Sequence, residues 1–165
     1  MRPVLVRPAV PADVPVLAQL RWEFRTAAAE PVEDRAGFEA RFRERVGRAL
    51  AGGSWRAWVA ELPEGSAGAQ DGIVGHVYAA RVDKLPNPVD EPESHLYVSN
   101  LYVRPTHRGR GIGTALLAAA LDLALAAADG TDAAILWAWP GSAGLYARHG
   151  FGPSPEILER RPVRR

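Results

Sequence analysis

The chain has 165 residues and a mass of 17.8 kDa, a length typical of one domain that buries its own core. Twenty Lys and Arg residues against nineteen Asp and Glu residues leave a formal charge of +1, so we expect no nucleic-acid partner and no membrane partner. Cysteine is absent, which excludes disulfides, cysteine nucleophiles and cysteine-containing zinc sites. We therefore predict a single domain over residues 1–165 in a cytoplasmic setting.

The N-terminal half alternates strand and helix patterns. A strand is predicted over residues 3–10, and Asp13 is the expected N-cap of a helix with Val16, Leu17, Leu20 and Phe24 on one stripe. A second amphipathic helix repeats Phe38, Phe42, Val46 and Leu50 at intervals of four and ends at the glycines of residues 51–53. Aromatic and β-branched runs then predict strands over residues 54–62, 73–82 and 95–103.

The second half adds a strand, helix and strand unit. The apolar stretch at residues 112–128 contains Asp122 and starts from a Gly/Arg loop, so we interpret it as a helix on a sheet rather than a membrane span. It leads into residues 133–139, an apolar run typical of a strand covered on both faces. Such a crossover is right-handed, so strands 95–103 and 133–139 should be parallel. A short helix over 142–149 and a last strand from Phe151 are expected to follow.

Three glycines at alternate positions follow the predicted strand 95–103. They lie in the segment 101–117, LYVRPTHRGRGIGTALL, where Arg108 and Arg110 precede the first two of them. A predicted helix follows the third glycine. Backbone N–H groups of such a turn, at the positive end of a helix, bind anions such as phosphate. A P-loop needs a lysine here, but Lys84 is the only lysine of the chain. A dinucleotide fingerprint is disfavoured because the third glycine is one residue early.

The run Arg108-Gly-Arg-Gly-Ile-Gly113, with the later run Leu145-Tyr-Ala-Arg-His-Gly-Phe151, resembles the GNAT superfamily of acyl-CoA N-acyltransferases. The resemblance covers residues 95–152. It implies an α/β (α+β) fold with a mixed, mostly antiparallel sheet flanked by helices, and a parallel strand pair splayed to hold acyl-CoA. Acetyl-CoA is then the co-substrate, no metal is needed, and the partner is a small-molecule or peptide amine.

The resemblance also implies residue roles. Main-chain N–H groups of the loop would hold the coenzyme A pyrophosphate: Arg108, Gly109, Arg110, Gly111, Ile112, Gly113 and Thr114. Leu101 and Val103 would offer backbone groups to pantetheine, and the N–H of Val103 would stabilise the oxyanion. Tyr146 would be the general acid that protonates the departing thiolate, since a phenol of pKa about 10 is an adequate donor.

The general base is not identified by the resemblance. Relatives often carry a carboxylate or histidine on the strand before the loop, where this chain has Tyr97, Ser99 and Asn100. His95 is the titratable group best suited by its reference pKa, with His76 and Glu61 as weaker alternatives. A second departure is Trp139, where relatives often carry an Asn. His107 and the C-terminal arginines are expected to be solvated, and the tryptophans mostly buried.

Three functional interpretations stay open. The first is acetyl transfer to a primary amine by direct attack in a ternary complex, since no nucleophile for an acyl-enzyme is identifiable. The second is a non-catalytic coenzyme A-binding regulatory module, and the third is transfer of a longer acyl chain. Acidic residues in the helical region and in the loop after residue 82 favour a cationic acceptor, and homodimerisation through the strand from Phe151 is a further possibility.

Overall fold

The computed structural model describes residues 4–63, 72–125 and 130–161. The helices and strands are β1 (Leu5–Pro8), α1 (Val14–Thr26), α2 (Arg35–Ala51), β2 (Arg56–Glu61), β3 (Ile73–Asp83), β4 (Ser94–Val103), α3 (Ile112–Leu125), β5 (Ala133–Ile135) and α4 (Ala143–Ala147). Two short 3-10 helices, Pro11–Asp13 and Pro105–His107, precede α1 and α3. Within these ranges no helix is long and apolar enough to cross a membrane.

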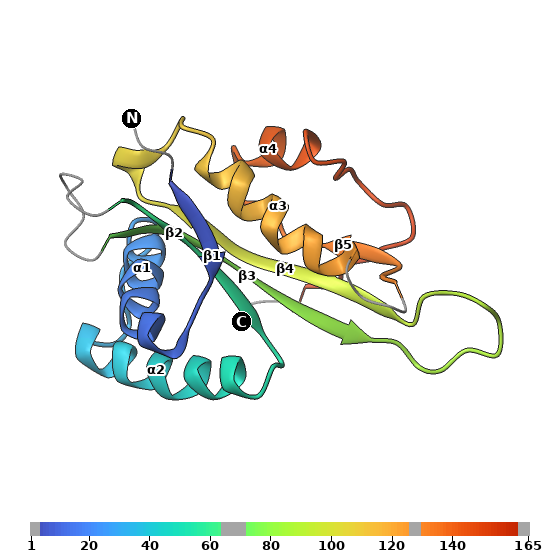
Figure 1. The fold of residues 1–165 in the computed structure, drawn as a ribbon, viewed down its shortest axis with the longest axis horizontal. Helices are drawn as coiled ribbons and strands as arrows, with labels where there is room; N and C mark the ends of the chain where they lie inside the picture. The colour runs from blue at the N-terminus through green and yellow to red at the C-terminus, as the bar shows by residue number, and fades with distance from the viewer. Residues whose placement is uncertain (1–3, 64–71, 126–129, 162–165) are drawn as a thin grey trace.

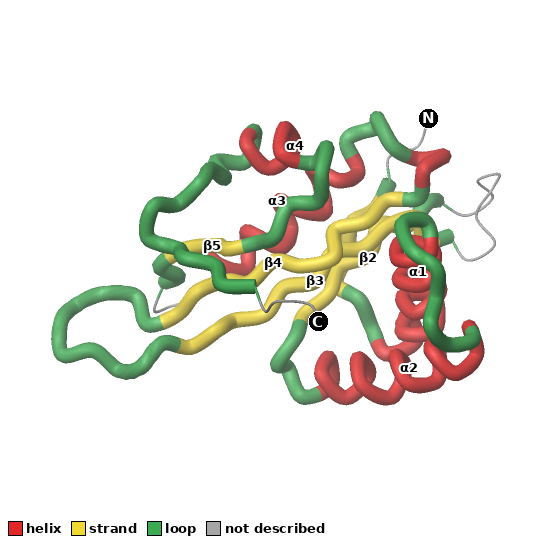
Figure 2. Tube along the Cα trace, turned by 180° about the vertical axis from the view of Figure 1, so that it is seen from behind, coloured by secondary structure: helices red, strands yellow, loops and turns green. Residues whose placement is uncertain are grey.

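One sheet of five strands organises the chain, in the spatial order β1-β2-β3-β4-β5. All neighbours are antiparallel except β4 and β5, which are parallel as expected for a strand-helix-strand crossover. Helices α1 and α2 cover one face and α3 covers the other (Figures 1 and 2). The predicted mixed, mostly antiparallel sheet with a parallel pair is therefore confirmed.

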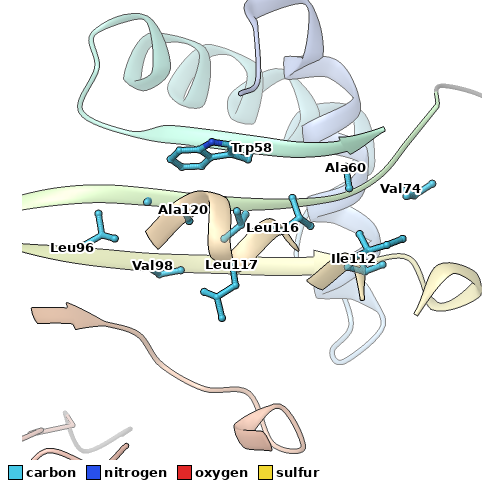
Figure 3. Close-up of a cluster of buried hydrophobic side chains, with 12 residues drawn as sticks. Trp58, Ala60, Val74, Leu96, Val98, Ile112, Leu116, Leu117 and Ala120 are labelled. Atoms are coloured by element: carbon cyan, nitrogen blue, oxygen red, sulfur yellow. The ribbon is translucent and has the colours of Figure 1, made fainter. Parts of the chain in front are cut away.

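The core has one layer on each face of the sheet. On one face, Leu116 and Leu117 of α3 are fully buried against Val74 and Val98 (Figure 3). On the other face, Leu17 and Leu20 of α1 pack with a cluster from β2, β3 and β4: Ala57, Val59, Ile73, Tyr78 and Tyr102. The apolar stripe predicted for α1 is thus the surface that meets the sheet, whereas α2 packs mainly against α1.

The two N-terminal helices begin in different ways. Asp34 caps α2 as a short polar side chain should, accepting a hydrogen bond from Gly37 N–H at 2.8 Å. Asp13 stands at the N-cap position of α1, as predicted, but its side chain accepts no hydrogen bond from the first turn of that helix. Its carboxylate accepts from Val10 N–H at 2.8 Å and pairs with Arg7 at 2.7 Å, because the intervening 3-10 helix turns it back toward β1.

The last predicted strands differ most from the structure. β5 ends at Ile135 instead of residue 139, since it pairs with β4 over three residues and no strand forms on its outer edge in residues 151–161. Trp137 and Trp139 consequently keep 63% and 48% of their surface exposed, so this run is not covered on both faces. The predicted helix 142–149 is the shorter α4. Residues 126–128 of the predicted helix 112–128 lie outside the described ranges.

β4 contains a bulge near its C-terminal end. His76 and Tyr78 of β3 pair with Tyr102 and Ser99, so one residue of β3 faces two of β4. Asn100, one of those two, has φ of +53°, a left-handed conformation that asparagine tolerates better than most residues. The bulge redirects the end of β4 at the level where β5 has already ended.

Candidate functional site

A cavity of about 790 Å³ lies where β4 continues beyond the end of β5. One part of its wall comes from the end of β4 and the loop into α3. We call it the glycine part, and its residues are Leu101, Val103, Arg108, Gly109, Gly111, Ile112, Gly113 and Thr114. A second part, which we call the aromatic part, consists of Phe24, Ala27, Ala28 and Trp139. Tyr146, Leu145 and Arg148 of the α4 region complete the wall, together with Tyr102, His107, Pro140, Gly141 and Ser142.

The glycine part is shaped by backbone conformations that only glycine adopts without strain. Gly109 and Gly111 have φ of +74° and +77°, and no atom lies within 4 Å of where a Cβ would stand at either residue. α3 begins directly afterwards, and the first N–H groups of a helix have no partner within the helix. The first turn of α3 therefore offers donors and a positive dipole end to the cavity, as an anion requires.

The arginines of the loop differ in position. Arg108 turns back onto β4, where its Nε donates to the carbonyl oxygen of Val103 at 2.9 Å and its Cζ lies 5.8 Å from the centre of the Tyr102 ring. Arg110 is exposed and is not part of the cavity wall. His107 is buried rather than solvated, a correction to the sequence analysis. Burial, followed by the charges of Arg110 and Arg104, lowers the pKa of His107.

The main chain of Val103 faces away from β3. Arg104 N–H donates to the carbonyl oxygen of Val74 on β3 at 2.9 Å. Because successive N–H groups of a strand point to opposite edges, the N–H of Val103 points toward the edge that β5 leaves uncovered. The residue that carries this group also lines the cavity.

Tyr146 lies on α4 and lines the same cavity as Val103. Its ring packs edge-on against Phe151, with ring centres 5.9 Å apart. Burial raises the pKa of Tyr146, and a hydrogen bond with Ser142 opposes that shift in part, so the phenol stays protonated at neutral pH. Ser142 in turn donates through its N–H (3.0 Å) and its Oγ (2.6 Å) to the carbonyl oxygen of Trp139. The main chain of Trp139 thus fixes the turn that starts α4.

The structure brings none of the three candidate bases to the cavity. His95 is at the opposite end of β4 from Val103, on the order of 25 Å away along the strand, and its Nδ1 lies 3.8 Å from Asp132. His76 is fully buried under the sheet, and burial and then Arg21 lower its pKa to about 3, which leaves it a poor base. Glu61 pairs with Arg7 at 2.6 Å.

Two of the acidic residues expected near the site are paired with arginines outside the cavity wall. Glu23 holds Arg104 through two contacts of 2.9 and 3.0 Å, and Glu33 pairs with Arg41. In the described part of the chain, no Asp or Glu lines the cavity, and no cluster of side chains suits a metal ion. The structure therefore gives no support to the expectation of a cationic acceptor.

Sequence reasoning favoured burial for Trp139 over a place in an acceptor pocket, and it did not assign Phe24, Ala27 or Ala28 to the cavity. The helical period assigns Phe24 to the core stripe of its helix, yet Phe24 stacks on Tyr102 with ring centres 5.2 Å apart and meets Trp139 edge-on at 6.1 Å. The same period groups Phe24 with Leu20 but does not show that the last turn of α1 passes the edge of the sheet. A strand over residues 133–139 would have hidden Trp139.

The cavity of this mixed five-stranded sheet therefore lies where β5 stops pairing with β4, beside the glycine loop that leads into α3. The acetyltransferase (GNAT) family matches residues 17–151, and the chain belongs to that family. A GCN5-related N-acetyltransferase from Ralstonia eutropha JMP134 is 29% identical, with a TM-score of 0.71 over 96% of this chain and 98% of that one.

Two further solved structures share the fold at lower identity. One is described as a predicted acetyltransferase with acetyl-CoA from Clostridium acetobutylicum, 23% identical, with a TM-score of 0.75 over 96% of each chain. The other is an acetyltransferase of Trypanosoma brucei, 16% identical, with a TM-score of 0.67 over 96% of this chain and 99% of that one. A comparison with curated proteins found no match.

Proposed function

We propose that this protein transfers an acetyl group from acetyl-CoA to a primary amine of a small molecule or peptide, by direct attack in a ternary complex. One observation carries the proposal: the glycine turn, the outward N–H of Val103 and the phenol of Tyr146 border the same cavity. That combination supplies a phosphate cradle, an oxyanion donor and an acid. The acetyl-CoA in the Clostridium acetobutylicum structure, which has the same fold, supports the choice of co-substrate.

Coenzyme A would be held mainly by main-chain groups. The pyrophosphate fits the turn of Gly109 and Gly111, where the absence of side chains lets its oxygens approach the N–H groups. The pantetheine arm would run along Leu101 and Val103, where the uncovered edge of β4 offers hydrogen-bonding groups. The exposed side chain of Arg110 adds positive charge nearby without lining the wall.

The chemical step follows from these positions. The amine nitrogen attacks the thioester carbon, and a C–N bond forms as the carbonyl oxygen becomes an oxyanion that the Val103 N–H stabilises. The C–S bond then breaks, and Tyr146 donates its proton to the leaving thiolate. The attacking nitrogen loses a proton to water, and Tyr146 recovers one from solvent. The chain has no cysteine, so no cysteine acyl-enzyme precedes this attack.

A non-catalytic coenzyme A-binding module is the second candidate. It is favoured by the lack of a carboxylate base among the described residues of the cavity wall. The proposed reaction does not need such a base if the acceptor enters as the free amine, with its proton already lost to water. Transfer of a longer acyl chain is a variant of the first candidate.

Turnover separates these candidates. The purified protein would be titrated with acetyl-CoA by calorimetry, then incubated with acetyl-CoA and a panel of polyamines, aminoglycosides, amino acids and peptides, with products read by mass spectrometry. Acetylated amine supports the proposal. Tight binding without turnover across the panel supports the module, faster transfer from longer acyl-CoA supports the variant, and no binding of any coenzyme A species overturns all three.

Three other expectations remain predictions: the single domain over residues 1–165, the cytoplasmic setting and the homodimer. The dimer hypothesis relied on a strand starting at Phe151, and residues 151–161 form none.

A further inference from the structure

Arg21 joins the bulge of β4 to the aromatic part of the cavity. It lies on the sheet-facing side of α1, partly buried, and its Nη1 donates to the side-chain oxygen of Asn100. Its Cζ lies 5.8 Å from the centre of the Phe24 ring, which lines the cavity. The guanidinium group therefore lies between the bulge and Phe24, beside the cavity and behind its wall.

The charge of Arg21 has no carboxylate partner among the residues that the structure describes. A guanidinium carries five N–H donors, and within those residues Asn100 alone is hydrogen-bonded to it. Burial, followed by the charge of Arg25, lowers the pKa of Arg21, so the surroundings disfavour the cation they contain. A partly buried arginine in such a position is normally paired with an anion.

The surroundings of Arg21 are positive and aromatic. Arg25 lies one turn further along α1, with its Cζ 5.8 Å from the centre of the Trp139 ring. The nearest acid of the same helix, Glu23, is engaged by Arg104 on both oxygens. A cationic acceptor would meet two arginines here, whereas an anionic group would complete the coordination of one of them.

We propose that Arg21 binds a carboxylate of the acceptor, and that the acceptor is an α-amino acid whose apolar or aromatic side chain packs in the aromatic part of the cavity. This inference rests on the acyl transfer proposed above and names the class of its acceptor. Guanidinium and carboxylate groups match in a planar, two-point geometry, which would also fix the orientation of the amine.

The spacing along β4 suits this class. Asn100 and Val103 are three residues apart, which corresponds to at most about 10 Å because the left-handed Asn100 shortens the extended rise. The path from the Val103 N–H to a guanidinium that binds the acceptor has a similar length, on the order of 8 to 10 Å. It passes through the oxyanion, the attacking nitrogen and the carboxylate two bonds beyond that nitrogen. An amine many bonds away from its carboxylate would overshoot one of the two contacts.

Matched acceptors test the inference without any variant. Phenylalanine, phenylalaninamide and phenethylamine share the aromatic group and the amine but differ in the carboxylate. With rates corrected for the fraction of free amine, we expect kcat/KM for phenylalanine to be at least tenfold above both analogues. Acetyl transfer with equal or higher kcat/KM for phenylalaninamide overturns the inference and leaves the proposed function intact, whereas failure of all amines overturns the proposed function.

Binding of the product gives a readout that does not depend on turnover. In the presence of coenzyme A, calorimetry should show N-acetylphenylalanine binding at least tenfold more tightly than N-acetylphenylalaninamide. Equal affinity, or no binding of either compound to a protein that binds coenzyme A, overturns the inference.

Variants separate carboxylate binding from support of the bulge. R21Q should reduce the ratio of kcat/KM for phenylalanine to kcat/KM for phenylalaninamide to about one. The KM for acetyl-CoA should stay within twofold. R45Q, a change of an exposed arginine on α2, should keep the ratio. N100G removes the bonded side chain but suits the φ of +53°, so it should also keep the ratio. An N100G ratio that falls with that of R21Q would show that Arg21 acts through the bulge and overturn the inference.

Discussion

Replacing Gly111 by alanine isolates the backbone contribution of the glycine turn. Gly111 has φ of +77°, and no atom lies within 4 Å of the position where a Cβ would stand. The substitution therefore adds no clash, and its cost is conformational, about 1–2 kcal/mol for a left-handed residue that is not glycine. The free protein either holds the turn at that cost or relaxes to negative φ.

Relaxation of the turn would redirect N–H groups that the proposed function assigns to the pyrophosphate. A hydrogen bond to a charged group contributes about 1.5–3 kcal/mol, so losing one weakens binding roughly 10- to 150-fold. We expect G111A to raise the Kd for coenzyme A by that factor and to lower the free energy of unfolding by up to about 2 kcal/mol. Calorimetry and urea denaturation measure the two quantities.

Gly47 provides the matched control. It lies within α2, where a Cβ would again have no atom within 4 Å, but its backbone is helical. G47A should therefore stabilise the protein by about 1 kcal/mol, the helix preference of alanine over glycine, and leave coenzyme A binding unchanged. If G111A neither weakens coenzyme A binding nor lowers the free energy of unfolding, the left-handed turn does not form the cradle and the assignment of the pyrophosphate site is wrong.

Three further outcomes are expected. Y146F should lower kcat by about 10²- to 10⁴-fold, the usual contribution of a positioned acid, with acetyl-CoA affinity within twofold; unchanged kcat in steady-state kinetics would remove Tyr146 from that role. G75A should lose about 1–3 kcal/mol in urea denaturation, because its Cβ would stand 2.8 Å from the carbonyl oxygen of Tyr102. Burial alone would raise the pKa of Asp13, but Arg7 and the Val10 N–H outweigh it and hold that pKa below its usual value. This stabilisation is complete above the unfolded pKa of about 3.9 and is lost as pH falls through the folded value, so D13N should flatten the acid side of the stability profile; an unaltered profile would contradict the pairing.

Most of the fold was predictable because burial leaves a period in the sequence. The spacing of Leu17 and Leu20 indicated the face that meets the sheet, and the aromatic and β-branched runs placed β2, β3 and β4. The parallel pair followed from the handedness of the crossover around α3. These features depend on local patterns and on general rules of chain connection.

The end of the sheet was not predictable from the same patterns. An apolar run shows that side chains avoid water, but it does not say whether a strand partner is available. Residues 136–139 have the composition of a strand, yet the next segment supplies no neighbour and Trp137 stays exposed. Asp13 illustrates the same limit, since its position favoured a cap while the ion pair with Arg7 decided its role.

The candidate site also has a part that the sequence located and a part that it did not. The glycine turn and Tyr146 stand in recognisable runs, so sequence placed them, although their roles remain proposals. Arg21, Phe24 and Trp139 come together only through the packing of α1 across the bulge of β4. No local pattern connects residues that lie more than a hundred positions apart in the chain.

Main-chain groups form much of the glycine part of the cavity, whereas side chains form its aromatic part. Substituting side chains leaves the peptide N–H groups in place. Under the proposed function, the acceptor preference can therefore change without a change in the binding of acyl-CoA. A library randomised at Phe24, Ala27, Ala28 and Trp139 would therefore retarget the enzyme to new amines while each member still loads the same thioester.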